Sequence, residues 1–276
     1  MWIRPLASMR RIAYCTLCMA SALLAPCVVQ GEEILVSAAT SLTEAFGEIG
    51  KRFTKIAPQT VVRFNFGASG ALQTQIEQGA PVDVFASASS KEMEALQGKG
   101  LVAKGAPFAF VGNRLVLIAG AQGQIRGWKD LATGAVKRIA LSNPNTVPSG
   151  RYAKETLTKR GVWEAVQPKL VFGENVRQTL AYVVNGDADA GLVFETDARA
   201  FANRVRVVAV AETGRDHTAI RYFATALGSA PNRSMAQRFV SFLQSKEAQA
   251  VLKSCGFSPL SLPRKPLSAS QKRGRH

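Results

Sequence analysis

The chain has 276 residues, of which 47% are hydrophobic and 20% are charged. This composition is typical of a globular protein, and the length suits one large domain or two small ones. The formal net charge of +16 could indicate a nucleic-acid partner, but the sequence contains no nucleic-acid-binding motif, so we expect none.

Residues 1–31 predict an export signal. Three arginines precede an apolar stretch over 12–29, and the segment contains no acidic residue. This pattern is typical of a cleaved secretory signal peptide, so we expect a periplasmic protein. A membrane anchor is disfavoured, because Ser21 and Pro26 interrupt a run that falls short of the ~20 apolar residues a span needs. Lipid attachment at Cys27 is disfavoured because Pro26 directly precedes it.

The mature chain has few groups that could hold a metal or a disulfide. Cys255 is its one cysteine, so an internal disulfide is excluded. With one cysteine and two histidines we expect no zinc or iron site and no cofactor. The basic stretch 263–276 lacks apolar periodicity and is expected to be disordered. The positive charge of the remaining chain would steer a small anion toward its site.

Strand-like and helix-like segments alternate from the start of the mature chain. The first helix shows its apolar residues at helical spacing up to Phe53, and Ser41 and Glu44 form a capping box that predicts its start. A turn at 67–70 leads into a second helix. Buried-strand patterns occur at 34–39, 61–66, 82–86 and 115–119.

The second half repeats this alternation. Asn175 predicts the cap of one helix, another is expected at 151–159, and a last one carries Phe239. Strand patterns lie at 138–141, 170–172, 190–194 and 206–210. The alternation predicts an α/β fold with mostly parallel sheets in two lobes. The expected ranges are 32–112 with 226–262 for the first lobe and 113–225 for the second.

Ser69, which lies between two glycines at a strand-to-helix turn, has three interpretations. A serine nucleophile needs the pattern Gly-x-Ser-x-Gly, but Ala71 occupies the last position, and His217 is the one histidine placed for a triad. The phosphate-loop and dinucleotide patterns are absent. The third interpretation is a helix N-terminus that directs its hydroxyl and N–H groups at an anion.

Four such strand-to-helix junctions occur in the chain. They lie at Ser41, Ser69, Ser149 and Val176. A single junction of this kind is ordinarily no more than a helix cap. Four of them in an α/β chain favour an anion site, because helix N-termini offer unpaired N–H groups and gather at the carboxyl ends of the strands.

Several segments, taken in order, resemble the periplasmic molybdate-binding proteins of ABC transporters, which are type II solute-binding proteins. The likeness covers nearly all of residues 33–260. It is carried by the segments at 37–42, 66–70, 79–85, 143–155, 175–177 and 191–194. The resemblance implies a two-lobed fold with a ligand cleft between the lobes. It implies ligand contacts from the Ser41 and Ser69 hydroxyl and N–H groups and from backbone N–H groups near Ser149 and Val176.

The resemblance also implies a function without catalysis: a monomeric protein that binds molybdate and tungstate and delivers them to a membrane permease with its cytoplasmic ATPase. One position departs from the family, because Phe194 stands where a tyrosine is common and cannot donate a hydrogen bond. Three alternatives remain open. They are a binder of another tetrahedral oxyanion such as sulfate, an enzyme using Ser69, and a cytoplasmic ligand-sensing domain of a regulator.

Overall fold

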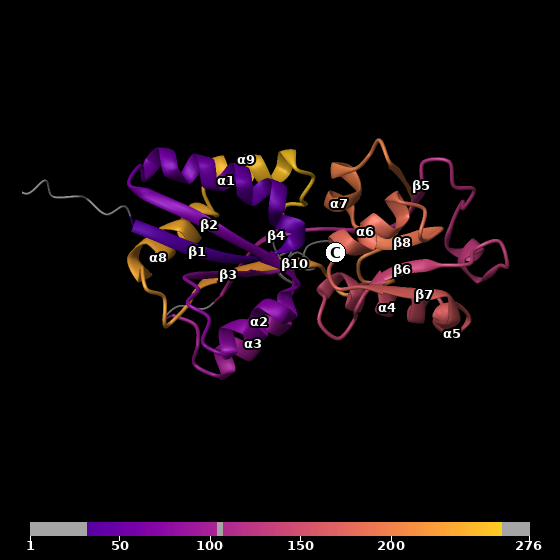
Figure 1. Ribbon diagram of the computed structural model, residues 1–276, viewed down its shortest axis with the longest axis horizontal. Coiled ribbons are helices and arrows are strands. Elements are labelled where there is room, and N and C mark those ends of the chain that lie inside the picture. The colour runs from indigo at the N-terminus through magenta and orange to yellow at the C-terminus, as the bar shows by residue number, and fades with distance from the viewer. Residues whose placement is uncertain (1–31, 104–106, 261–276) are drawn as a thin grey trace, which may run out of the picture. The chain divides into compact units, whose positions relative to one another are not determined.

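The computed structural model describes residues 32–103 and 107–260 and contains two five-stranded sheets (Figure 1). The predictions for the signal peptide at 1–31, for Cys27 and for the tail at 263–276 lie outside the described residues. We call each sheet with its helices a lobe. Among the described helices, none combines the length and the apolar character that crossing a membrane requires.

The first sheet has the strand order β2-β1-β3-β10-β4. Strand β1 is parallel to β2 and β3, whereas β10 is antiparallel to β3 and β4. The strands are β1 (Glu32–Ala39), β2 (Thr60–Gly67), β3 (Val84–Ser87), β4 (Phe108–Gly112) and β10 (Arg221–Ala226). The helices are α1 (Thr43–Ile56), α2 (Ser69–Glu77), α3 (Ser90–Gly98), α8 (Arg233–Phe242) and α9 (Lys246–Ser254).

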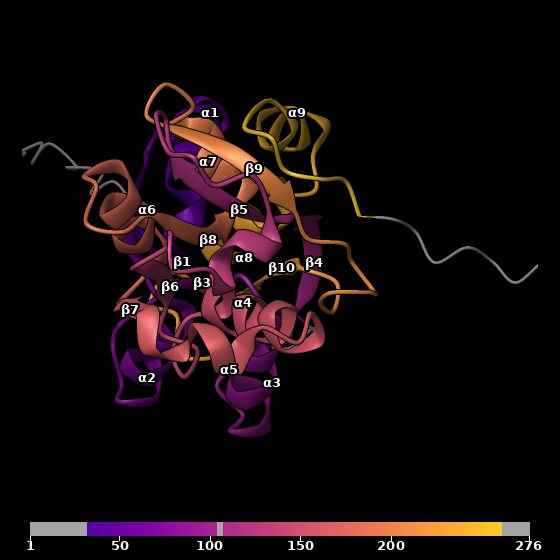
Figure 2. The same ribbon diagram turned by 90° about the vertical axis from the view of Figure 1, so that its right-hand side faces the viewer.

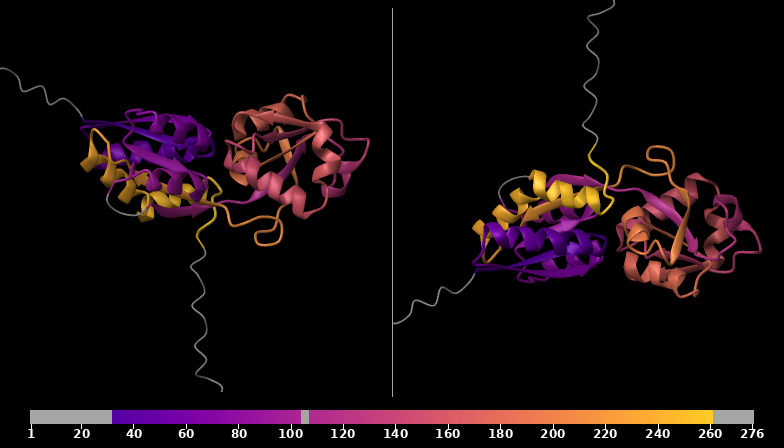
Figure 3. Two further views of the ribbon diagram at one scale, coloured as in Figure 1. Left: turned by 90° about the horizontal axis from the view of Figure 1, so that it is seen from below. Right: turned by 90° about the horizontal axis from the view of Figure 1, so that it is seen from above.

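Helices pack on the first sheet, and its inner strand β3 is buried at every position. The amphipathic helix α1 buries Phe46 and Phe53, whose rings lie 6.0 and 5.2 Å from that of Phe239 in α8. Figures 1 and 3 show α9 beside α1. Helices α2 and α3 close a second apolar cluster, which contains Leu72, Ile76, Val82, Phe85, Met93, Leu96 and Leu227.

The second sheet has the order β7-β6-β8-β5-β9, with β5 and β9 side by side in Figure 2. Strand β6 is parallel to β7 and β8, and β5 is antiparallel to β8 and β9. Its strands are β5 (Leu115–Gly120), β6 (Ile139–Ser142), β7 (Leu170–Gly173), β8 (Ala190–Phe194) and β9 (Val205–Val210). Its helices are α4 (Pro148–Lys159), α5 (Trp163–Val166), α6 (Val176–Val184) and α7 (Glu195–Ala200).

The α/β class is confirmed, but the expectation of mostly parallel sheets is wrong. Each sheet contains two parallel and two antiparallel pairings, because β10 and β5 run against their neighbours. Strand β10 also belongs to the first sheet, so the boundary placed between 225 and 226 falls inside this strand. Sequence patterns missed α3, β4, α5, α7, β10 and α9, most of which are short or lack a clear apolar period.

The capping box at Ser41 is likewise wrong. Residues Thr40–Leu42 form a 3₁₀ turn, α1 starts at Thr43, and no side chain caps it. The Ser41 hydroxyl instead lies 2.7 Å from the Tyr222 hydroxyl. Helix α4 begins three residues earlier than predicted, with Pro148 in its first turn, where a missing N–H removes no helical hydrogen bond.

Gly150 is required by the close packing of α4 against the end of β6. A methyl group at this position would lie 2.1 Å from the Ser142 carbonyl oxygen, which is backbone and cannot rotate away, whereas one at Gly47 in α1 would meet nothing within 4 Å. Chemical denaturation should therefore show Gly150→Ala lowering the free energy of unfolding by more than about 2 kcal/mol. The control Gly47→Ala should raise it by up to about 1 kcal/mol. Equal stability of the two variants would contradict this packing.

Candidate functional site

The register of the parallel strands brings the predicted site residues together in pairs. Ala39 at the end of β1 pairs with Gly67 at the end of β2, so the turns carrying Ser41 and Ser69 begin side by side. Ser142 at the end of β6 pairs with Gly173 at the end of β7, so α4 and α6 begin side by side in the same way. Each lobe thus presents two adjacent helical first turns at the carboxyl edge of its sheet.

Contacts between the lobes join these two pairs of turns. The Gly70 N–H donates to the Thr146 carbonyl over 2.9 Å, which places the start of α2 against the loop before α4. A Cβ at Gly70 would lie 2.6 Å from the same oxygen, so this approach needs glycine. Helix α6 contacts the 3₁₀ turn that contains Ser41. The four predicted residues therefore gather in one region, and each is at least 97% buried: Ser41, Ser69, Ser149 and Val176.

The helix starts leave backbone N–H groups available at this region. No side chain caps α2 or α4. Helix α6 is capped as the sequence predicted, because the Asn175 side chain accepts from the N–H groups of Arg177 and Gln178. The Val176 N–H is then the first-turn donor of α6 that the cap does not take.

The serine hydroxyls differ in which way their hydrogens can point. Ser69 Oγ accepts from the Ala88 N–H over 3.2 Å, so its own hydrogen remains free to donate. Ser149 Oγ donates to Ser142 Oγ over 2.8 Å, and Ser142 lies 2.8 Å from Thr179 Oγ1. Thr179 in turn donates to the backbone carbonyl of Asn175, the residue before α6, so this chain directs the Ser149 hydrogen inward. Ser149 can offer a ligand its backbone N–H but not its hydroxyl hydrogen.

Phe194 forms an apolar part of this region. It is the last residue of β8, its side chain is 2% exposed, and its ring lies 5.9 Å from the Tyr222 ring and 6.4 Å from the Tyr152 ring. Burial raises the pKa of Tyr152 to about 12, so this phenol keeps its proton at neutral pH. The three rings shield the neighbouring polar groups from water.

Sequence reasoning missed several residues that the fold brings to the site. The Tyr222 hydroxyl contacts Ser41, and Asn113 donates to that hydroxyl, although both residues are distant from Ser41 in sequence. No motif indicates them, because each is a single polar residue in an apolar or loop segment. The same holds for Asp197 in α7, which pairs with Arg177 of the 175–177 segment.

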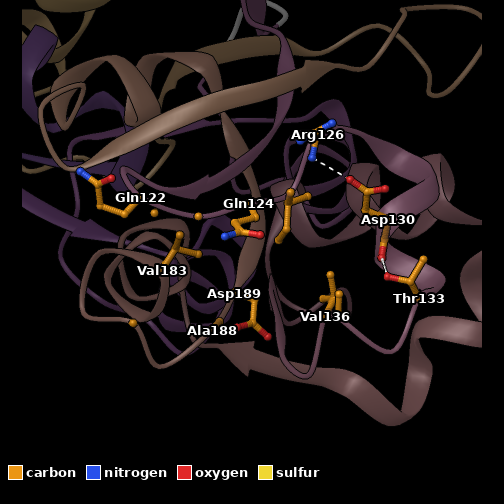
Figure 4. A pocket seen from close by; sticks show the side chains of 14 residues that line it. Gln122, Gln124, Arg126, Asp130, Thr133, Val136, Val183, Ala188 and Asp189 are labelled. Atoms are coloured by element: carbon orange, nitrogen blue, oxygen red, sulfur yellow. Dashed lines mark hydrogen bonds between the residues drawn. The ribbon is translucent and has the colours of Figure 1, made fainter.

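One cavity borders this region, and a larger one lies away from the predicted residues. One of about 230 Å³ borders it and is lined by residues that include Ser41, Thr196 and Cys255. A larger one of about 720 Å³ lies in the second lobe and contains none of the predicted residues (Figure 4). Its carboxylates are already engaged, since Asp130 accepts from the Arg126 N–H and Asp189 accepts from neighbouring backbone N–H groups.

An ion triad on α1, α6 and α7 links the lobes beside the site. Arg177 pairs with Asp197 over 2.7 Å and also with Glu44 of the first lobe. Asp197 is fully buried, and burial raises its pKa to about 7 even though the Arg177 guanidinium opposes that rise. The folded protein therefore holds a proton on Asp197 over a pH range in which the unfolded chain has lost it.

The serine geometry predicts unequal effects of two matched truncations. Ser69→Ala removes a hydroxyl hydrogen that can reach an anion and should weaken anion binding by about 1.5–3 kcal/mol. Ser149→Ala removes a hydroxyl whose hydrogen points inward and should change binding by less than about 1 kcal/mol. Calorimetric titration of both variants measures the difference. A larger loss in Ser149→Ala than in Ser69→Ala would show that the hydroxyl directions are reversed.

The Asp197 carboxyl predicts a pH dependence of stability. Its pKa is higher in the folded state, so its contribution to stability is present at acidic pH and is lost as the pH rises to about 7. Asn at this position cannot titrate. The free energy of unfolding of the wild type minus that of Asp197→Asn should fall between pH 4 and 7 by up to about 1.4 kcal/mol per pH unit. Urea titrations at several pH values measure it, and a difference independent of pH would contradict the raised pKa.

Comparison with known proteins identifies the family of this chain. Residues 34–258 match the family model of the bacterial extracellular solute-binding proteins. A Haemophilus influenzae molybdate-binding protein, ModA, is 38% identical over 82% of this chain and 90% of its own length. A Bacillus subtilis protein named as an ABC transporter substrate-binding lipoprotein is also 38% identical, over 82% and 86%.

A solved structure shows the same likeness. The periplasmic molybdate-binding protein of Azotobacter vinelandii superposes with a TM-score of 0.74 at 26% identity, covering 83% of this chain and all of that one. The match therefore extends through both lobes and all four first turns. The chain belongs to the family of bacterial extracellular solute-binding proteins, which includes the periplasmic molybdate-binding proteins.

Proposed function

We propose that this protein captures molybdate outside the cytoplasm and delivers it to an ABC permease and its cytoplasmic ATPase. The observation that carries the proposal is the gathering of four helical first turns, at Ser41, Ser69, Ser149 and Val176, into one buried region. The relatives that are named molybdate-binding proteins support the choice of anion. Tungstate, a dianion of the same shape, is expected to bind as well.

The chemistry of the anion matches a site built from donors. Molybdate is a tetrahedral dianion without a proton at neutral pH, so all its oxygens accept hydrogen bonds. A buried dianion loses its hydration, and this loss must be offset by dense hydrogen bonding. Each bond to a charged acceptor contributes about 1.5–3 kcal/mol. The Ser41 and Ser69 hydroxyls and the N–H groups near Ser149 and Val176 would supply several such bonds.

Two arginines beside the predicted first turns have carboxylate partners. Arg177 pairs with Asp197 and Glu44, and Arg151 in α4 pairs with the buried Glu92 over 2.6 Å. In the proposed mechanism neutral groups hold the anion. The arginines instead form ion pairs between the lobes, since Glu44 and Glu92 belong to the first lobe. Hinge closure would form these pairs over a bound anion, and the permease would receive the protein in this closed form.

Ser69 has no catalytic role in the proposed function. Its hydroxyl lies against the Ala88 N–H, and His217 is engaged with the Thr218 carbonyl and the ring of Tyr152. The described residues show no serine–histidine hydrogen bond of the kind that activates a nucleophile. We expect a monomer that binds one anion.

Titration calorimetry of the mature protein against molybdate, tungstate, sulfate and phosphate tests the proposal. We expect one molybdate per chain. Molybdate at 100 times its dissociation constant should also raise the free energy of unfolding by about 2.7 kcal/mol, because it binds the folded state alone. A thermal melt that molybdate leaves unchanged but sulfate raises would contradict the proposal and support a sulfate carrier.

A further inference from the structure

Four buried residues form a continuous hydrogen-bonded chain that ends at the site. Asn113 Nδ2 lies 2.9 Å from Thr196 Oγ1 and 3.2 Å from the Tyr222 hydroxyl, and that hydroxyl lies 2.7 Å from Ser41 Oγ. The side chains come from the segment that connects β4 to β5, from β10, from α7 and from the turn after β1. Each of the four residues is 5% exposed or less.

The backbone fixes the orientation of the amide that starts this chain. Asn113 Oδ1 accepts from the Arg114 N–H over 2.9 Å, so the other end of the amide must be the nitrogen. That nitrogen carries two hydrogens and no lone pair for accepting. It therefore donates to Thr196 and to Tyr222, and the Tyr222 oxygen is an acceptor in the second bond.

The direction of the next bond follows from what Tyr222 can do with its own hydrogen. Burial raises the pKa of Tyr222 well above its ordinary value, so the phenol stays protonated. Among the partners that the described residues provide, Ser41 Oγ accepts this hydrogen, since the Asn113 nitrogen cannot. If Ser41 donated instead, the phenolic hydrogen would be buried without a protein partner, at a cost of about 1–3 kcal/mol.

We propose that Asn113, acting through Tyr222, holds the Ser41 hydroxyl as an obligate donor and thereby restricts the site to oxyanions that carry no proton. Asn113 and Tyr222 are positioning residues in this proposal, which rests on the anion-binding function proposed above. Ser41 Oγ accepts from Tyr222, so its own hydrogen is left free to donate to the anion. Ser69 Oγ likewise accepts from the Ala88 N–H, so its hydrogen is also free to donate. Hydrogen phosphate needs an acceptor for its proton, and these two hydroxyls face it as donors.

Sulfate and phosphate form the matched pair of probes, because they have similar size and shape and at neutral pH only phosphate keeps a proton. Both are titrated directly into the mature protein and are also tested for displacement of bound molybdate. For the wild type we expect sulfate to bind, and to displace molybdate, at a concentration at least tenfold lower than phosphate does. Comparable binding of the two anions by the wild type would overturn the inference.

Two variants test the hydrogen-bond chain itself. Asn113→Asp puts a carboxylate where the donor was, so Tyr222 would donate to it and accept from Ser41, and Ser41 would present a lone pair to the anion. Tyr222→Phe removes the link without adding charge. In both variants the dissociation constants of sulfate and phosphate should come to within about threefold of each other. The control Asn145→Asp adds the same charge at an exposed position in the loop before α4 and should keep the wild-type ratio of the two dissociation constants.

The ratio of the two anions distinguishes this role from a structural one. A variant that only loosens the site loses affinity for sulfate and phosphate in the same proportion and keeps their ratio. An unchanged ratio in either folded variant therefore overturns the inference, and Tyr222→Phe decides the question if Asn113→Asp does not fold. Failure of the wild type to bind molybdate would instead contradict the proposed function. The direct sulfate and phosphate titrations would still test the hydroxyl direction.

Discussion

Parallel pairing of strand ends is the constraint on which the site depends. Because β1 and β2 end in register at Ala39 and Gly67, the two turns that follow them must share one sheet edge. The same pairing of Ser142 with Gly173 fixes the starts of α4 and α6. Each pair of turns presents its N–H groups in one direction, and a helix N-terminus attracts negative charge. The proposed anion site would thus arise from the sheet topology rather than from any single side chain.

The roles of charged and neutral groups in this protein are separated in space. Neutral hydroxyl and N–H donors surround the predicted anion position, whereas Arg151 and Arg177 pair with Glu92 and Glu44 across the lobes. The Glu92 carboxylate is buried, and separating it from Arg151 would leave a buried charge unpaired, so this contact favours one arrangement of the lobes over others. In the proposed function, neutral donors would let the site hold a dianion firmly and still release it when the lobes part, because no buried positive charge would be left behind.

The direction of each hydroxyl hydrogen decides which serines of the site can donate a hydrogen bond to a ligand. Ser149 belongs to a chain that runs inward to the Asn175 carbonyl, whereas Ser69 accepts from the Ala88 N–H and Ser41, in the proposed arrangement, accepts from Tyr222. Distance alone would treat the three side chains alike. The difference arises because a serine hydroxyl has one hydrogen, and its partners determine where that hydrogen can go.

The sequence by itself determined the α/β class, the elements with strong apolar periodicity, the Asn175 cap and the presence of four strand-to-helix junctions, because these features depend on residues close together in the chain. It did not determine the antiparallel β10 and β5 or the 3₁₀ turn at Ser41. The partners Tyr222 and Asn113 also escaped it. Ser41 and Tyr222 are 181 residues apart, and their 2.7 Å contact exists only because β10 returns to the first sheet. Tertiary structure decided which hydroxyls can donate, since this depends on partners that no local pattern encodes.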